Sequence, residues 1–476
     1  MNPRSLVLCC AVLAACASAP PVTQVKELDL ALPASWTTPI PAAPTPETAT
    51  SAADAWWQGF GDPELNRLVE AALQNNRDLR AALARLEAAA QSRTIAAAGA
   101  LPEVDAGFDA QRSRRLFLGF PFAGGTPSST TTTFGLSLSL RWELDLWGRV
   151  RAGDSAAIAD LQAAAADHAG ARLSLVAQTC RAYFAAVEAR QQLALAEATV
   201  VSIRQTAEDV RDRFRRGVRP ALDVHLAATN LANAEANVAQ RRDALQRASR
   251  QLDLLAGRYP RGDAGIAPAM PGTLPPVPAS LPGELLQRRP DLVAAERRLA
   301  ADGCRVDAAR AALYPRLSLT ASGGTSTEKL EDLVDDDFRV WSLGANLLQP
   351  LFRGGALRAD IARAQARRAE ALANYGSAVL HAFVEVEDTL AATAQLDERQ
   401  RATTSAANHA RLASEMARDR YQLGLADFLA TADGQRQAYQ ADSARLSIER
   451  QRLENRIDLF LALGGGFAAP TSDVSQ

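Results

Sequence analysis

The residues from 134 to 146 alternate between apolar and polar side chains without a break. The apolar positions are Phe134, Leu136, Leu138, Leu140, Trp142, Leu144 and Leu146. A period of two predicts a strand with one apolar face and one polar face. At about 3.3 Å per residue this strand is about 43 Å long, and a tilt near 45° lets it cross the roughly 30 Å hydrocarbon layer of a bilayer. Trp142 and Trp147 are then expected near a membrane interface.

Three further stretches carry strand patterns, at about 103–115, 315–325 and 338–349. A loop rich in Gly, Pro, Ser and Thr (119–133) precedes the strand at 134–146, and an acidic loop (328–337) separates the last two strands. A single strand of a soluble β-sandwich can show the same alternation. Four strands cannot close a barrel, and open edges in lipid leave backbone groups unpaired. We therefore expect three copies to share one 12-stranded barrel around a water-filled lumen.

Helical patterns fill most of the remaining chain. They cover about 64–98, 150–215, 222–256, 284–312, 355–423 and 425–463. Breaks near Gly217 and Pro220, and near Gly424, interrupt the longest runs. At about 1.5 Å per residue, one long helix matches two short helices placed end to end. The pattern predicts an elongated bundle in which short helices pack beside each long one, with coiled-coil-like spacing.

The chain contains an internal repeat. Residues 75–106 align with 288–319, and "RFRRGVRPALDV" (213–224) aligns with "RYQLGLADFLAT" (420–431). Each copy is expected to contain helix, strand, strand, helix, helix. The predicted organisation is repeat 1 at 61–256, a Pro-rich equatorial linker at 257–283, repeat 2 at 284–464 and a C-terminal tail at 465–476.

The first residues have the pattern of a secretory signal. Arg4 precedes a short apolar core, and "LAAC" ends at Cys16 in the manner of a lipobox. We therefore expect a signal peptide at 1–15, a lipid on Cys16, and a Pro/Ala-rich lead at 16–60. The alternative is an ordinary signal peptide cleaved nearby. After this segment no run of 18 apolar residues occurs, so membrane crossing is expected from strands.

Charge and composition exclude several classes of function. The net charge is −2, which gives no indication of a nucleic-acid partner. The four His are scattered, there is no C-x-x-C motif, and no metal site is expected. Cys180 lies on an apolar helical stripe and is expected to be a buried hydrophobe. No nucleophile elbow or phosphate loop is present, so a lipoprotein enzyme is a remote alternative and no cofactor is expected.

Several motifs occur in an order that resembles a known family. They are "WWQGFGDPELNRLVEAAL", "RWELDLWGRVR", "RRPDLVAAERRL" and "YQLGLADFLATADGQRQAY". These resemble the TolC-like outer membrane efflux channels, in particular their OprM/CusC/NodT-like lipoprotein branch. The resemblance implies a mixed α and β membrane protein, a homotrimer whose outer-membrane β-barrel continues into a periplasmic helical tunnel. It also implies a non-catalytic exit duct that works with a periplasmic adaptor protein and an inner-membrane RND-type transporter. A periplasmic adaptor itself is the main alternative class, but it usually has one helical hairpin and no twofold repeat.

The resemblance also implies a gate at the periplasmic ends of the helix pairs. Tyr421, Leu429 and Asp433 match positions that narrow the tunnel near the second break, and Asp223 lies in the comparable place after the first. Threefold symmetry would turn each aspartate into a ring that favours cations. The alternative for both aspartates is a solvated or helix-capping acid. Ala426 and Ala430 replace charged gate residues of some members, so a salt-bridged lock like theirs is not expected.

The adaptor is expected to dock at the same ends. The resemblance implies that Gly217 and Gly424 let adaptor backbones approach closely. The first break also carries a basic cluster absent from the second, formed by Arg211, Arg213, Arg215, Arg216 and Arg219. We interpret Arg215, Arg216 and Arg219 as an asymmetric docking site. A solvated helix end is the alternative for this cluster.

Overall fold

The computed structural model describes residues 20–21, 35–38, 55–117, 128–275, 282 and 285–465. The chain divides into two compact units. One comprises 1–28, 86–164 and 295–375, and the other comprises 29–85, 165–294 and 376–476. The predicted signal peptide, Cys16 and most of the lead and the C-terminal tail lie outside the described residues.

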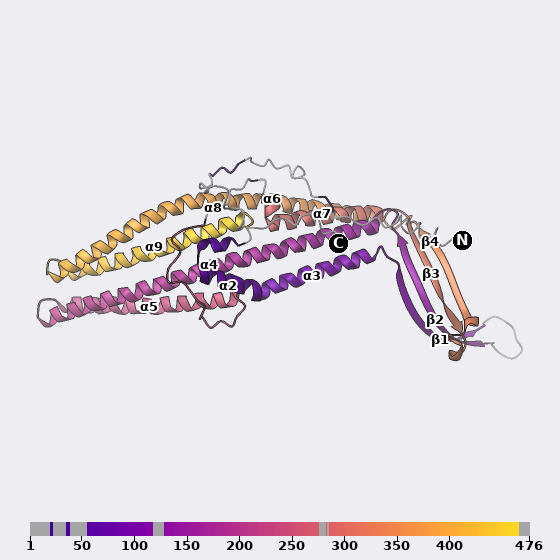
Figure 1. Cartoon of the computed structure of the whole chain (residues 1–476), viewed down its shortest axis with the longest axis horizontal. Coiled ribbons are helices and arrows are strands. Elements are labelled where there is room, and N and C mark those ends of the chain that lie inside the picture. The colour runs from indigo at the N-terminus through magenta and orange to yellow at the C-terminus, as the bar shows by residue number, and fades with distance from the viewer. Residues whose placement is uncertain are drawn as a thin grey trace. The chain divides into compact units, whose positions relative to one another are not determined.

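The first unit contains a four-stranded antiparallel sheet in the order β1-β2-β3-β4 (Figure 1). The strands are β1 (Glu103–Leu116), β2 (Ser128–Leu144), β3 (Arg316–Thr327) and β4 (Arg339–Leu348). Their pairing is continuous, with Phe108 opposite Leu136 and Leu138 opposite Gly323. Because side chains alternate across a strand, this register collects the apolar residues of β1 and β2 on one face of the sheet, with Thr130, Thr132 and Thr325 on that face toward the ends of the strands. Asp105, Ser137 and Ser139 lie on the other face.

Strand β2 differs from its predicted bounds of 134–146. It begins at Ser128 and ends at Leu144, so it takes in the last six residues of the segment expected to be a loop, 119–133. The run Thr130–Thr133 explains the extension, because β-branched threonines favour extended backbone. The chain leaves the sheet before Leu146 because Asp145 turns to cap the following helix. The other strands keep their predicted places within two residues.

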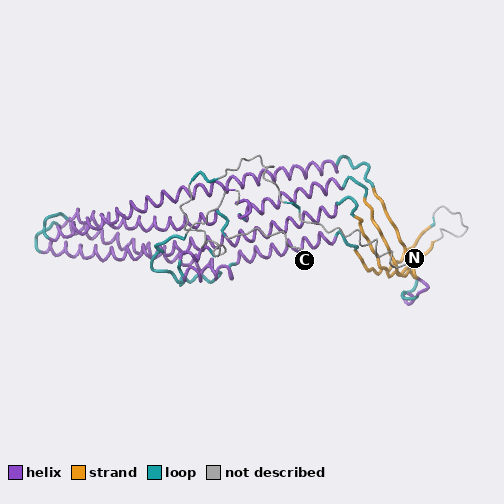
Figure 2. Tube along the Cα trace, turned by 45° about the horizontal axis from the view of Figure 1, so that its top comes forward, coloured by secondary structure: helices purple, strands orange, loops and turns teal. Residues whose placement is uncertain are grey.

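The two longest described helices are α4 (Arg149–Arg215) and α8 (Ala356–Gln422). Each has 67 residues and is followed by a 35-residue helix, α5 (Ala221–Leu255) or α9 (Phe428–Ala462). Figure 2 shows the helices in purple and the strands in orange along one continuous trace.

Two predicted helices are wrong as continuous elements. The run at 64–98 is split into α2 (Pro63–Asn75) and α3 (Arg77–Ala98), and the run at 284–312 into α6 (Leu285–Arg288) and α7 (Pro290–Ala311). At the first break the Asn76 Oδ1 accepts hydrogen bonds from the Asp78 and Leu79 amides, so Asn76 caps a new helix. At the second break Pro290 starts a new helix, since it has no amide hydrogen to continue the previous one.

The core of the second unit lies where the short 3₁₀-helix η3 (Trp56–Phe60) and α2 pack against α4, α5 and α9. Trp56 stacks on Phe460 with ring centroids 5.0 Å apart. Cys180 is fully buried here, as predicted, and burial raises the pKa of its thiol. Part of the linker, 264–274, also packs against this core.

Candidate functional site

The junction between β2 and α4 is built from two acids and two arginines of the motif "RWELDLWGRVR". The Asp145 carboxylate accepts hydrogen bonds from the Val150 amide at 3.1 Å and the Arg151 amide at 2.8 Å. It therefore caps the exposed start of α4. Glu143 accepts two hydrogen bonds from the Arg149 guanidinium, at 3.0 and 2.9 Å. The motif thus ties the last residues of the strand to the first turn of the helix.

Gly148 makes the direct change of direction at this junction. Its φ is 76°, a left-handed conformation that side-chain-bearing residues adopt only with strain. Both indoles beside it are anchored to carbonyl groups. Trp142 donates to the Ala100 carbonyl at 2.9 Å, and Trp147 donates to the Pro315 carbonyl at 2.8 Å while stacking on Tyr314. The sequence identified these residues but not their partners, which lie far away in the chain.

The far ends of the two helix pairs form a second candidate site. Both α4 and α8 end in the same turn, in which a glycine takes a left-handed conformation (Gly217 φ 74°, Gly424 φ 78°). The Val218 amide then donates to the Arg213 carbonyl, and the Leu425 amide to the Arg420 carbonyl. This is the Schellman arrangement that satisfies the last carbonyls of a helix. We name the turn at 216–220 tip 1 and the turn at 423–427 tip 2.

Two arginines from α4 and tip 1 hold tip 2 in the same chain. Arg213 donates to the Tyr421 carbonyl at 2.8 Å and the Gln422 carbonyl at 2.6 Å. Arg219 donates to the Ala426 carbonyl at 2.9 Å. Their guanidinium carbons lie 4.6 and 5.2 Å from the centre of the Tyr421 ring, within the range of a cation–π interaction. We call this arrangement the tip clamp.

The predicted gate residues occupy different environments. Tyr421 is only 1% exposed and packs against the ring of Phe428. The sequence pattern did not predict a role for Phe428. Leu429 is 60% exposed at the start of α9. Asp223 lies in the first turn of α5. Asp433 is exposed, and hydrogen bonds from Arg436 and then Gln437 hold its pKa below the ordinary value. Asp427, rather than either predicted acid, caps α9 through the Ala430 amide.

The predicted docking arginines do not act alike. Arg215 forms an ion pair with Asp212 one turn earlier on α4. Arg216 is exposed. Arg219 belongs to the tip clamp. A single sequence could not separate these roles, because Arg219 finds its partner more than 200 residues away.

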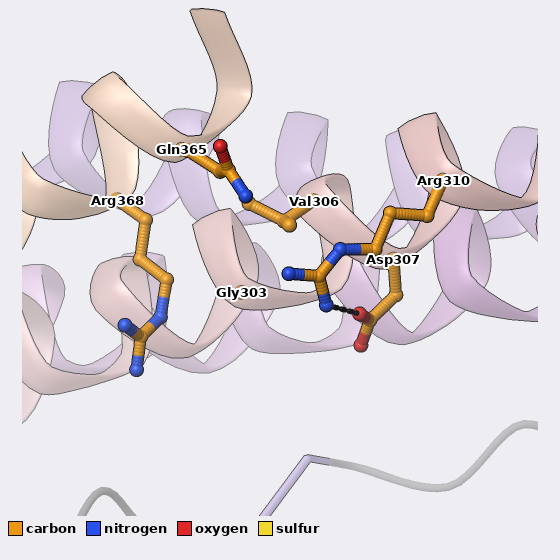
Figure 3. Close-up of a pocket in the computed structure, with 6 residues that line it drawn as sticks. All are labelled: Gly303, Val306, Asp307, Arg310, Gln365 and Arg368. Atoms are coloured by element: carbon orange, nitrogen blue, oxygen red, sulfur yellow. Dashed lines mark hydrogen bonds and ion pairs between the residues drawn. The ribbon is translucent and has the colours of Figure 1, made fainter. Parts of the chain in front are cut away.

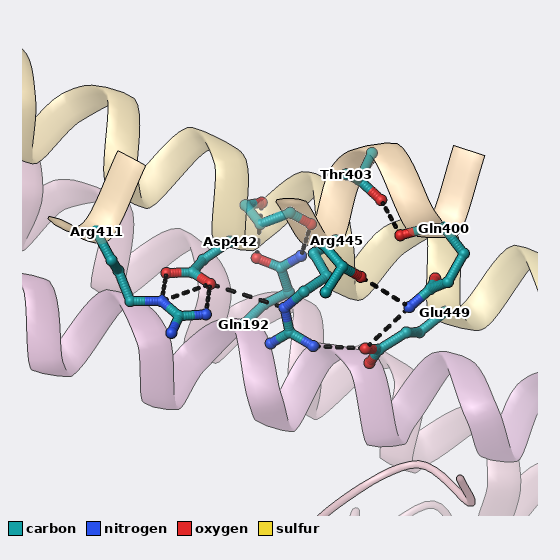
Figure 4. Close-up of polar contacts among 9 residues, drawn as sticks. Gln192, Gln400, Thr403, Arg411, Asp442, Arg445 and Glu449 are labelled. Atoms are coloured by element: carbon teal, nitrogen blue, oxygen red, sulfur yellow. Dashed lines mark hydrogen bonds and ion pairs between the residues drawn. The ribbon is translucent and has the colours of Figure 1, made fainter. Parts of the chain in front are cut away.

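A group of polar side chains connects α4, α8 and α9 (Figure 4). Asp442 accepts hydrogen bonds from Arg411 at 3.1–3.3 Å and lies 3.7 Å from Arg445. The hydrogen bond and charge of Asp442 raise the pKa of Arg411. Gln192 donates to the Ser443 carbonyl at 3.0 Å. The contacts fix how the helices face one another, and they resemble no catalytic constellation.

A shallow hollow lies between α7 and α8 in the first unit (Figure 3). It is lined by Gly303, Val306, Asp307, Arg310, Gln365 and Arg368. Asp307 and Arg310 form an ion pair at 3.4 Å, which partly neutralises the hollow. Among the described residues no group of His, Cys, Asp and Glu could hold a metal ion. No described helix is both long and apolar enough to cross a membrane.

Known proteins with a similar sequence and fold are outer membrane proteins. The pattern of the family described as "Outer membrane efflux protein" matches residues 68–258 and 281–465. The chain is 36% identical over 418 residues to the outer membrane protein OprJ of Pseudomonas aeruginosa, covering 86% of each chain. It is 32% identical to the pyoverdine export outer membrane protein OpmQ of the same species, covering 100% of this chain and 99% of that one. The structure of the outer membrane protein VceC from Vibrio cholerae matches with a TM-score of 0.78 and 29% identity, over 87% of this chain and 99% of that one.

The four-stranded sheet, the two long helix pairs and these matches together identify an outer membrane efflux channel protein. The chain belongs to the outer membrane efflux protein family, whose members are TolC-like channels of the outer membrane.

Proposed function

We propose that three copies of the chain form the outer membrane channel of a tripartite efflux pump. The observation that supports this most strongly is the sheet itself. Its edge strands, β1 and β4, have no further strand partner within the described residues. Open edges are costly in lipid, and pairing the β1 edge of one copy with the β4 edge of the next removes them. Three copies then supply twelve strands around a polar lumen.

The helices continue this channel as a periplasmic tunnel. The duct is passive, and an inner-membrane RND-type transporter with a periplasmic adaptor supplies the energy and the cargo. Relatives are named for the export of pyoverdine, toluene and solvents, so the cargo we propose is small organic molecules. A lipid on Cys16 anchors the mature chain to the membrane.

The gate lies at the tips. Closing the tunnel requires the two tips of each copy to stay together, and the tip clamp supplies the contacts for this. Leu429 and the aspartates at 223 and 433 form rings under threefold symmetry, which narrow the exit and favour cations. Gly217 and Gly424, with Arg215 and Arg216, form the adaptor docking surface, while Arg219 acts mainly within the clamp.

Conductance in a planar bilayer tests the proposal. Purified protein is expected to give discrete, cation-selective conductance steps, and loss of the gene is expected to increase susceptibility to small organic toxicants. Protein that is recovered from the outer membrane but never conducts would contradict the channel function.

A further inference from the structure

Beyond the level of Phe134, the apolar face of the sheet carries two arginines on β1, followed by Leu116 at the end of the strand. On β1, Ala110 lies opposite Phe134, Arg112 opposite Thr132, and Arg114 opposite Thr130. Because side chains alternate along a strand, both arginines lie on the same face as Phe134. Both are exposed. Arg115, the next residue, lies on the opposite, polar face.

The length of the apolar face places these arginines beyond the hydrocarbon layer. The ten steps from Leu144 to Phe134 on β2 cover about 33 Å, or about 23 Å along the membrane normal at a 45° tilt, close to the roughly 25 Å apolar band of outer-membrane barrels. Arg112 and Arg114 lie two and four steps further. At the same tilt this is roughly 5 and 10 Å beyond the band, the depth of lipid headgroups.

The ends at which the strands connect to the helices determine which leaflet of the membrane Arg112 and Arg114 face. The helices join the strands at Glu103, Leu144, Arg316 and Leu348, and the arginines lie at the opposite ends of the strands. This step rests on the proposed function. With the helices in the periplasm, Arg112 and Arg114 face the outer leaflet of the outer membrane.

The charge at this position fits a phosphate partner. The Arg114 Nη2 donates to the Ser128 Oγ at 3.1 Å, which orients the guanidinium and engages one of its five N–H donors. Guanidinium groups bind phosphate through paired, charge-assisted hydrogen bonds. We propose that Arg112 and Arg114 bind phosphate groups of the outer-leaflet glycolipid, lipopolysaccharide, around the rim of the barrel.

A neighbouring copy of the chain is the rival partner. The β3–β4 connection carries carboxylates such as Glu331, Asp332 and Asp336, of which Asp336 pairs with Arg339. An acidic loop of the next copy could meet the β1 edge. The position of Arg112 and Arg114 on the apolar face favours lipid, since that face points away from the lumen in the proposed barrel.

The test compares the double variant Arg112→Gln/Arg114→Gln with Arg115→Gln, which removes one charge from the other face of the same strand. Full-length protein is purified in detergent, and its binding to lipopolysaccharide and to dephosphorylated lipopolysaccharide is measured. We expect the double variant to bind intact lipopolysaccharide about tenfold more weakly or worse, since an arginine near an anionic membrane surface contributes roughly 1 kcal/mol. Arg115→Gln is expected to change little, and dephosphorylation is expected to remove the difference.

Three results would overturn this inference. The first is unchanged lipopolysaccharide binding in the double variant. The second is an equal loss of lipopolysaccharide binding in Arg115→Gln. The third is reduced oligomer stability of the double variant with unchanged lipopolysaccharide binding, which would assign the arginines to the neighbouring copy. Conductance is recorded on the same preparations. A variant that conducts normally but binds lipopolysaccharide like the wild type refutes only the lipid site, whereas wild-type protein that never conducts refutes the channel function.

Discussion

At the scale of single residues, Gly148 shows how one backbone conformation joins the sheet to a helix. Its φ of 76° costs a residue with a side chain about 1–2 kcal/mol. We expect Gly148→Ala to lower the free energy of unfolding by about that amount, seen as a lower midpoint in thermal unfolding of the purified protein. Gly153→Ala is the matched control. Gly153 lies inside α4 with open space around its Cβ position, so alanine there should stabilise by roughly 0.5–1 kcal/mol. Equal effects at both positions would contradict the role of Gly148.

The tip clamp gives a second residue-scale prediction. Arg213→Ala removes two hydrogen bonds to tip 2 and a contact with the Tyr421 ring. We expect faster hydrogen exchange of the amides at 422–427, by about thirtyfold if each of the two hydrogen bonds contributes roughly 1 kcal/mol. Tyr421→Phe should leave exchange unchanged, because the Tyr421 hydroxyl is buried and has no hydrogen-bond partner among the described residues. If Tyr421→Phe opens the tip as much as Arg213→Ala, the hydroxyl has a role that the clamp does not explain.

At the scale of elements, the two faces of β2 predict opposite responses to charge. Leu138 lies on the apolar face opposite Ala106 and Gly323. A lysine there should oppose membrane insertion by about 2–4 kcal/mol if it lies near the bilayer midplane. Ser139 is on the polar face opposite Asp105, so a lysine there gains an opposite charge. We expect Leu138→Lys to reduce the assembled outer-membrane fraction and Ser139→Lys to preserve it. Comparable assembly of both variants would show that the apolar face does not meet lipid.

The lead at 36–38 docks on α8 through one carboxylate. The Glu387 carboxylate accepts hydrogen bonds from the Thr37 amide at 2.7 Å and the Thr38 amide at 3.1 Å. Trp36 packs edge-on against Phe383. Partial desolvation raises the pKa of Glu387, but the hydrogen bonds from Thr37 and Thr38 outweigh it, and the pKa lies below the ordinary 4.5.

A pKa depressed in the docked state gives stability that is present above the ordinary pKa and is lost as pH falls through the lowered value. We therefore expect the lead to stay docked at neutral pH and to be released only as the pH falls below the ordinary carboxyl pKa of 4.5. Cleavage of the lead by an acid-active protease over a pH series measures this release. Glu387→Gln should make cleavage largely independent of pH, and Glu398→Gln, farther along α8, serves as the control. Release at the same pH in Glu387→Gln and wild type would contradict the mechanism.

Local patterns in the sequence predicted the strands and long helices because each has a strong period. They did not predict the break at Asn76, whose side chain caps α3 and also bonds the Leu255 carbonyl from a distant helix. Likewise, the sequence located the tips at Gly217 and Gly424 through their glycines. It could not locate the tip clamp, because Arg213 meets its partners only when two distant helix pairs pack together.

At the scale of the whole molecule, the open edges of the sheet couple folding to assembly. β1 and β4 are the outer strands of the sheet, and a stable sheet in lipid requires both edges to be paired. A mass three times that of the processed chain is therefore expected for the detergent-purified protein. The sheet should also be lost together with the oligomer.

Heating the protein while recording oligomer mass and strand-sensitive infrared absorption tests this coupling. We expect both signals to disappear in one transition, because a monomer in detergent leaves two strand edges unsatisfied. We expect the helical signal to persist to higher temperature, since the helix pairs have their own core around Val210, Tyr421 and Phe428. A monomer that keeps its full strand signal would show that the edges are satisfied within one chain, and it would remove the physical argument for a shared barrel.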